Sequence, residues 1–92
     1  MALTRAMESH YERTKAQAAF LDLKRDELRP DDEISLLGLL DAQQNLRVEQ
    51  SILVGHFHMV QETIQKKNIR LDTVTFHRIQ KIGTYCKRLS LD

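Results

Sequence analysis

The feature that most constrains the fold is a run of helical periodicity over about 36 residues, from Asp32 to Lys67. Apolar residues recur there at three- and four-residue steps, and Gln43 and Gln50 interrupt them. The apolar seam consists of Leu36, Leu39, Leu46, Leu53, Phe57, Val60 and Ile64. A straight helix of this length would measure ~54 Å, whereas a compact chain of this size has a radius of gyration near ~12 Å. The helix therefore either breaks near Gly55 or forms one arm of an elongated hairpin, and we expect it to be continuous.

Amphipathic segments on both sides of this run predict two further helices. The first extends from about Leu3 to Leu28, and the second begins after Asp72, which is a favourable N-cap residue. The apolar face of the second consists of Phe76, Ile79, Ile82, Cys86 and Leu89. The connections, Arg29–Asp32 around a proline and Asn68–Leu71, are short, so each predicts a reversal of chain direction.

The composition favours a single all-α domain. One proline and three glycines in 92 residues leave too few turn residues for a many-stranded β fold. Hydrophobic residues make up 41% of the chain and charged residues 29%, which are globular rather than disordered proportions. We therefore predict one helical domain over residues 1–92, an antiparallel helical hairpin or three-helix bundle with a long central helix.

The sequence predicts a cytoplasmic protein that does not insert into a membrane. Cys86 is the only cysteine, so it cannot form an internal disulfide, which fits a reducing compartment. The segment Met1–Arg13 is polar and lacks the apolar run of a signal peptide. The longest uncharged stretch, Gln50–Gln61, is much shorter than the ~20 residues of a membrane span.

Candidate catalytic and metal-binding residues all have simpler structural explanations. Cys86 shares the apolar face of its helix with Ile79 and Ile82, so we interpret it as a core residue rather than a nucleophile. His56 and His58 are two positions apart and point about 200° away from each other on a helix, so they cannot share one metal ion. We expect no catalytic residue, no metal ion and no cofactor, and the protein is predicted not to be an enzyme.

The charge is unevenly distributed along the chain. Residues 1–63 carry a net charge of −4 and residues 64–92 a net charge of +5. A candidate basic surface on the last helix consists of Arg78, Lys81, Tyr85 and Arg88. This candidate basic surface motivates an alternative hypothesis, a small DNA-binding regulator that uses its C-terminal helix. The overall pI of about 7.9 argues against nucleic acid as a partner.

The apolar face of the long helix is wider than a two-stranded seam requires, because Leu37, Leu40, Ile52 and Val54 flank it. A chain this short buries only about 60–65% of its unfolded surface. The sequence therefore predicts a non-enzymatic protein-interaction module: a small adaptor, an assembly subunit, or a chaperone or co-chaperone. Its partner would be another protein or a second copy in a homo-oligomer. The predicted partner-binding residues are Leu40, Val54, Phe57 and Met59.

The segment Leu39–Leu46, with the sequence LLDAQQNL, resembles the long-helix segment of bacterial outer-membrane efflux channels. The similarity covers this segment alone, and those channels are several times longer than this chain. Stretches rich in leucine, alanine and glutamine are common in long packed helices. The resemblance therefore implies a long packed helix, and no function follows from it.

Overall fold

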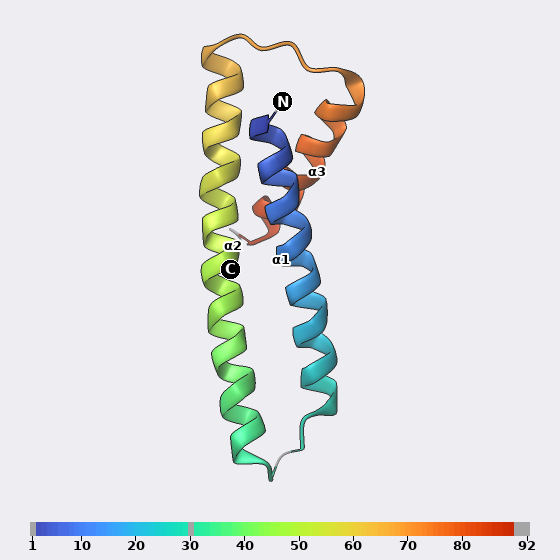
Figure 1. Cartoon of the computed structure of the whole chain (residues 1–92), viewed down its shortest axis with the longest axis vertical. Helices are drawn as coiled ribbons and strands as arrows, with labels where there is room; N and C mark the ends of the chain where they lie inside the picture. The colour runs from blue at the N-terminus through green and yellow to red at the C-terminus, as the bar shows by residue number, and fades with distance from the viewer. Residues whose placement is uncertain (1, 30, 90–92) are drawn as a thin grey trace.

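A computed structural model describes residues 2–29 and 31–89, which form three α-helices and no strand (Figure 1). The helices are α1 (Ala2–Glu27), α2 (Glu33–Lys66) and α3 (Thr73–Leu89). α1 and α2 form an antiparallel hairpin, and α3 packs across the half of the hairpin that is remote from the α1–α2 turn. The predicted all-α architecture is confirmed. Pro30, placed at the predicted helix break, lies outside the described residues.

The long helix is continuous, as expected. α2 passes through Gly55 without a break, and the molecule measures 55 × 23 × 19 Å with a radius of gyration of 16.2 Å. This radius exceeds the ~12 Å of a compact chain of this length. The chain is therefore an elongated hairpin with a third helix on one half.

Two aspartates fix where α2 and α3 begin. The carboxylate of Asp32 accepts hydrogen bonds from the Ser35 hydroxyl at 2.6 Å and from the Ser35 backbone N–H at 3.1 Å. The Asp72 carboxylate accepts one from the Thr75 backbone N–H at 2.7 Å. Each satisfies a donor that the first turn of a helix leaves unpaired. At the other end of α2, Asn68 adopts a positive φ of 50°, which asparagine tolerates at the residue that ends a helix.

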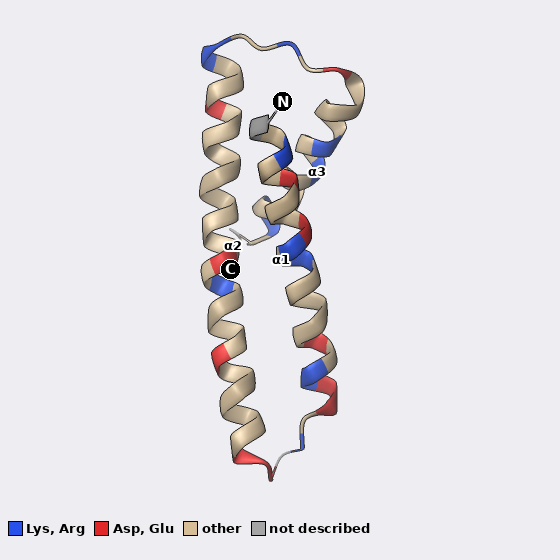
Figure 2. Cartoon of the chain, in the orientation of Figure 1, with Lys and Arg blue, Asp and Glu red and all other residues tan. Residues whose placement is uncertain are grey.

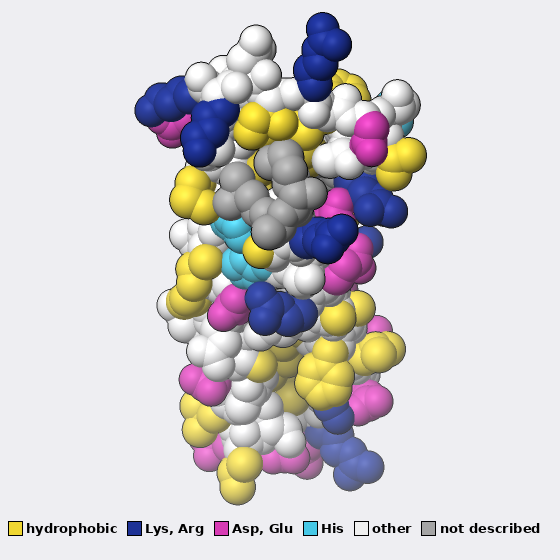
Figure 3. Space-filling view, turned by 45° about the horizontal axis from the view of Figure 1, so that its top comes forward, with side chains coloured by type: hydrophobic (Ala, Val, Ile, Leu, Met, Phe, Trp, Pro, Cys, Tyr) yellow, Lys and Arg dark blue, Asp and Glu magenta, His cyan; other side chains and the backbone are white. Residues whose placement is uncertain are grey.

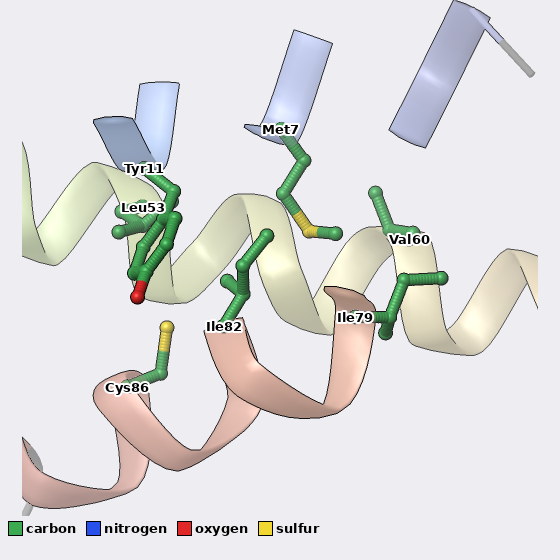
Figure 4. Packing of buried hydrophobic residues seen from close by; sticks show 7 residues of the cluster. All are labelled: Met7, Tyr11, Leu53, Val60, Ile79, Ile82 and Cys86. Carbon is green, nitrogen blue, oxygen red and sulfur yellow. The ribbon is translucent and has the colours of Figure 1, made fainter. Parts of the chain in front are cut away.

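The core lies where all three helices meet (Figure 4). Its buried side chains point toward one another from α1 (Met7, Tyr11), α2 (Leu53, Val60) and α3 (Ile79, Ile82, Cys86). Tyr11 also packs edge-on against Tyr85 with ring centroids 5.4 Å apart. The core therefore includes the C-terminal half of the predicted seam on α2 and most of the predicted apolar face of α3.

α3 approaches α2 closely at Gly83. A Cβ atom built at this position would lie 2.8 Å from the Cζ atom of the Phe57 ring, nearer than van der Waals contact allows. A glycine inside a helix is unfavourable relative to alanine. Its presence in α3 is explained by the Phe57 ring, which packs against the backbone there.

The half of the hairpin nearest the α1–α2 turn has no third helix over it (Figure 1). Among the described residues from Ala18 to Leu46, only Leu21 and Leu46 are buried. Leu36 belongs to the predicted seam, yet it is 39% exposed, because α3 does not extend along α2 to cover it. The three-helix bundle thus occupies only one half of the molecule.

We expect Gly83→Ala to lower the free energy of unfolding by about 1 kcal/mol. Displacing the Phe57 ring costs about 1–3 kcal/mol, which the better helix propensity of alanine offsets by about 1 kcal/mol. Urea denaturation measures the change. In a double-mutant cycle, Gly83→Ala should cost less in a Phe57→Leu background than in the wild type. A variant as stable as the wild type would contradict the close packing.

The two caps predict a loss of stability in acid. Hydrogen bonds from the side chain and backbone of Ser35 lower the pKa of Asp32 below 3.8, and those from Thr75 do the same for the pKa of Asp72. A lowered pKa in the folded state stabilises the fold above pH 3.8, and this stability is lost as the pH falls through the folded-state pKa values. The double variant Asp32→Asn, Asp72→Asn keeps hydrogen-bonding caps that do not titrate.

We therefore expect urea midpoints of the double variant to fall less between pH 5 and pH 2 than those of the wild type. Asp26→Asn, on the exposed surface of α1, is the matched control and should follow the wild-type profile. Identical acid profiles for the wild type and the double variant would show that the caps do not contribute.

Candidate functional site

An open groove of about 590 Å³ lies between the C-terminal half of α2 and α3. The two helices are close at Phe57 and Gly83 and diverge toward the loop of residues 67–72 that joins them (Figure 1). We call this feature the α2–α3 groove. Its lining residues are Phe57, His58, Gln61, Ile64, Gln65, Leu71, Phe76, Ile79, Gln80, Gly83, Thr84, Cys86 and Lys87.

The α2–α3 groove is apolar with a polar edge whose one Lys or Arg side chain is Lys87. Aromatic and aliphatic side chains such as Phe57, Ile64 and Phe76 supply most of its surface, and the amides of Gln61 and Gln80 add hydrogen-bonding groups. No carboxylate is among its lining residues. A surface of this composition can bury apolar side chains of a ligand and hydrogen-bond to polar groups beside them.

The four predicted partner-binding residues do not form one surface. Val54 and Phe57 are half-buried and pack against the core, so α3 already occupies much of their surface. Leu40 and Met59 are each about half exposed. They are separated by about 28 Å along α2 and by about 100° around it. The structure thus places Phe57 in the groove and Leu40 and Met59 on two other sides of α2.

The candidate basic surface is less uniform than its sequence indicates. Arg78, Lys81 and Arg88 are exposed, but the Tyr85 ring packs against Tyr11. The Tyr85 hydroxyl also accepts a hydrogen bond from the Gln50 amide at 3.3 Å.

Acidic side chains lie close to this basic surface. Arg78 lies 3.7 Å from the Glu8 carboxylate of α1, and acidic and basic segments adjoin over α1 in Figure 2. Three cations remain exposed, in a surface of mixed charge.

Sequence reasoning missed a polar contact between the two long helices. His10 is buried, and its Nε2 atom lies 3.2 Å from the Glu49 carboxylate, while its ring centroid is 6.1 Å from that of His56. His10 follows Met7 by three positions and precedes Thr14 by four, so its spacing could have placed it on the buried face. The described residues contain no group of three His, Cys, Asp or Glu side chains that could hold a metal ion.

Cys86 is a core residue, as predicted. Its side chain is buried between the helices, and this burial raises the pKa of the thiol. A raised pKa reduces the thiolate fraction at neutral pH, and the thiolate is the reactive form. The residue therefore contributes packing at the floor of the α2–α3 groove.

A second apolar surface lies on the side of α2 that faces away from the buried Leu46 and Leu53. It consists of Ile34, Leu37, Val48, Ile52 and Met59, which we call the α2 outer stripe, and each is between 48% and 83% exposed. At 100° per residue these five positions share an arc of about 60°, whose centre is turned about 140° from the buried Leu46 and Leu53. In Figure 3, hydrophobic side chains reach the surface along the α2 side of the molecule.

Comparisons with known proteins add no relative: no family model, curated protein or solved structure matches the chain. Three-helix architecture alone does not define a function, because simple helical folds serve many unrelated ones. No helix within the described residues is long and apolar enough to cross a membrane. The two apolar surfaces are therefore the features from which a function can be argued.

Proposed function

We propose that this chain is a non-enzymatic helical protein-interaction module, a small adaptor, assembly subunit or co-chaperone, whose α2–α3 groove receives an amphipathic helix of a partner. The observation that carries this proposal is the open apolar groove of about 590 Å³ with amide side chains at its edge. Helix-in-groove binding uses such a surface, because the apolar face of the partner helix is buried and its polar flanks remain hydrated.

The spacing of the groove residues suits a helix as the occupant. Phe57 and Ile64 on α2 are seven positions apart, as are Phe76 and Gly83 on α3. Seven helical residues span about 10 Å, which equals two turns of a partner helix with anchors at i, i+3 or i+4, and i+7. Two diverging helices also present ridges between which a third helix can pack.

The chemistry of the groove favours binding over catalysis. Its one thiol belongs to Cys86, which is buried in the core and has a raised pKa. The alternative function, DNA binding through α3, is less well supported, because Tyr85 is engaged by Tyr11 and Gln50 and Arg78 lies beside Glu8. A protein partner is therefore the proposal that the geometry favours.

A matched pair of α3 variants tests the groove. Phe76 is 52% exposed and lines the groove, whereas Val74 is 59% exposed and does not. We expect Phe76→Glu to weaken binding of groove partners at least tenfold, about 1.4 kcal/mol, because it places a charge on the buried apolar contact. Val74→Glu should leave binding unchanged. Both variants should fold, since neither side chain is buried.

The measurement is quantitative pull-down with tagged wild type and both variants, followed by titration of any protein that Phe76→Glu loses and Val74→Glu retains. Circular dichroism and urea denaturation confirm that the variants are folded. If Phe76→Glu captures every protein that the wild type captures, and with equal affinity, the groove is not the binding site.

A further inference from the structure

We infer that two copies of this chain pair through the α2 outer stripe, with the two α2 helices antiparallel. The stripe lies on a different side of α2 from the α2–α3 groove, so the pair leaves the groove open for the partner proposed above. The inference shares with the proposed function only the premise that exposed apolar helix faces bind protein.

The charges on the arc that holds the stripe are few and opposite. Besides its five apolar residues, the arc contains Asp41, Gly55 and Lys66. Asp41 lies toward one end of α2 and Lys66 is its last residue. Two stripes that pack antiparallel can therefore place each Asp41 beside Lys66 of the second copy.

The same register matches four further positions of the arc, whereas Ile34 and Leu37 extend past the end of the second α2 toward its loop of residues 67–72. Val48 follows Asp41 by seven positions, and Met59 precedes Lys66 by seven, so Val48 lies opposite Met59 of the second copy. Ile52 follows Val48 by four, and Gly55 precedes Met59 by four, so Ile52 lies opposite Gly55. One antiparallel register thus pairs the opposite charges, Val48 with Met59, and Ile52 with Gly55.

Gly55 gives the Ile52 side chain of the second copy room to approach. A Cβ atom at Gly55 would meet no other atom of the chain within 4 Å, whereas one at Gly83 would overlap the Phe57 ring. Glycine is disfavoured inside a helix, and Gly83 has a reason within the chain that Gly55 lacks. A Cβ atom at Gly38 of α2 would also meet no atom within 4 Å, but of the two only Gly55 lies on the arc of the stripe, where a second helix can pack against it.

The ends of the molecule are also complementary in charge. Asp31, Asp32 and Glu33 outnumber Arg29 at the α1–α2 turn, and Lys67 and Arg70 outnumber Asp72 in the α2–α3 loop at the other end (Figure 2). Antiparallel pairing brings the acidic end of each copy toward the basic loop of the other, whereas parallel pairing would place like charges together. Lys66 already lies 2.8 Å from Glu62 of its own chain, and its three N–H donors allow a second carboxylate.

Sedimentation equilibrium of the full chain, from low micromolar to near-millimolar concentration, tests the pairing. We expect a monomer–dimer equilibrium whose dissociation constant rises at least tenfold in Ile52→Asp and stays at the wild-type value in Val74→Glu. Phe76→Glu, which alters the groove, should dimerise as the wild type does. A wild type that stays monomeric throughout overturns the inference and leaves the groove proposal standing.

Spin-label distances test the direction of the pair. Ser51 and Gln44 are exposed and flank the stripe, so each is replaced by a labelled cysteine in a Cys86→Ala background. In the proposed register the two Ser51 positions are offset by about 8 Å along the helices and the two Gln44 positions by about 28 Å. The label distance at position 51 should therefore be about 15 Å shorter. Equal distances at both positions would mean a parallel pair and would overturn the proposed geometry.

Charge exchange tests the register. Asp41→Lys should raise the dissociation constant about tenfold, because the two pairs of opposite charge in the dimer become pairs of like charge. Adding Lys66→Asp should recover most of the lost affinity. If the double variant dimerises no more tightly than Asp41→Lys alone, Asp41 and Lys66 do not lie opposite each other in the dimer. Loss of the dimer in Phe76→Glu but not in Ile52→Asp would place the self-contact in the groove and overturn the inference.

Discussion

The difference in length between α3 and the hairpin determines the rest of the structure. α3 has 17 residues and spans about 26 Å, whereas α2 has 34 residues and spans about 51 Å. A closed apolar core forms only where three helices meet, so the cluster around Leu53 and Ile82 is confined to one half of the molecule. Where α3 diverges from α2 a groove remains, and where α2 has no neighbour its outer side chains stay exposed.

Helix starts and the continuity of α2 were predicted from the sequence, because interactions between residues close in sequence determine them. Asp72 caps the helix that it was expected to begin, and Asp32 caps α2, because a cap depends only on the next three residues. The continuity of α2 through Gly55 also followed from the periodicity, which extends well beyond the glycine on both sides. The extent to which α3 covers α2 could not be predicted, since it depends on the angle that the loop of residues 67–72 sets between the two helices.

The candidate surfaces were predicted less well for the same reason. Val54 and Met59 have similar sequence surroundings, yet α3 packs on the side of α2 that carries Val54 and leaves Met59 exposed. Tyr85 was expected on the candidate basic surface, and its contact with Tyr11 depends on how α1 and α3 cross. The contact between His10 and Glu49 joins residues 39 positions apart. Helical spacing assigns a residue to a face, but only tertiary packing decides what that face meets.

Hydrogen exchange along α2, measured on the chain at low concentration, tests most directly whether stability is confined to the half that α3 covers. Backbone amides exchange through local unfolding wherever few buried side chains stabilise a segment. The account predicts slow exchange from Leu53 to Val60, at the rate of global unfolding, and much faster exchange from Leu36 to Asn45. Uniformly slow exchange over the whole of α2 would contradict it, because the uncovered half would then be as stable as the core.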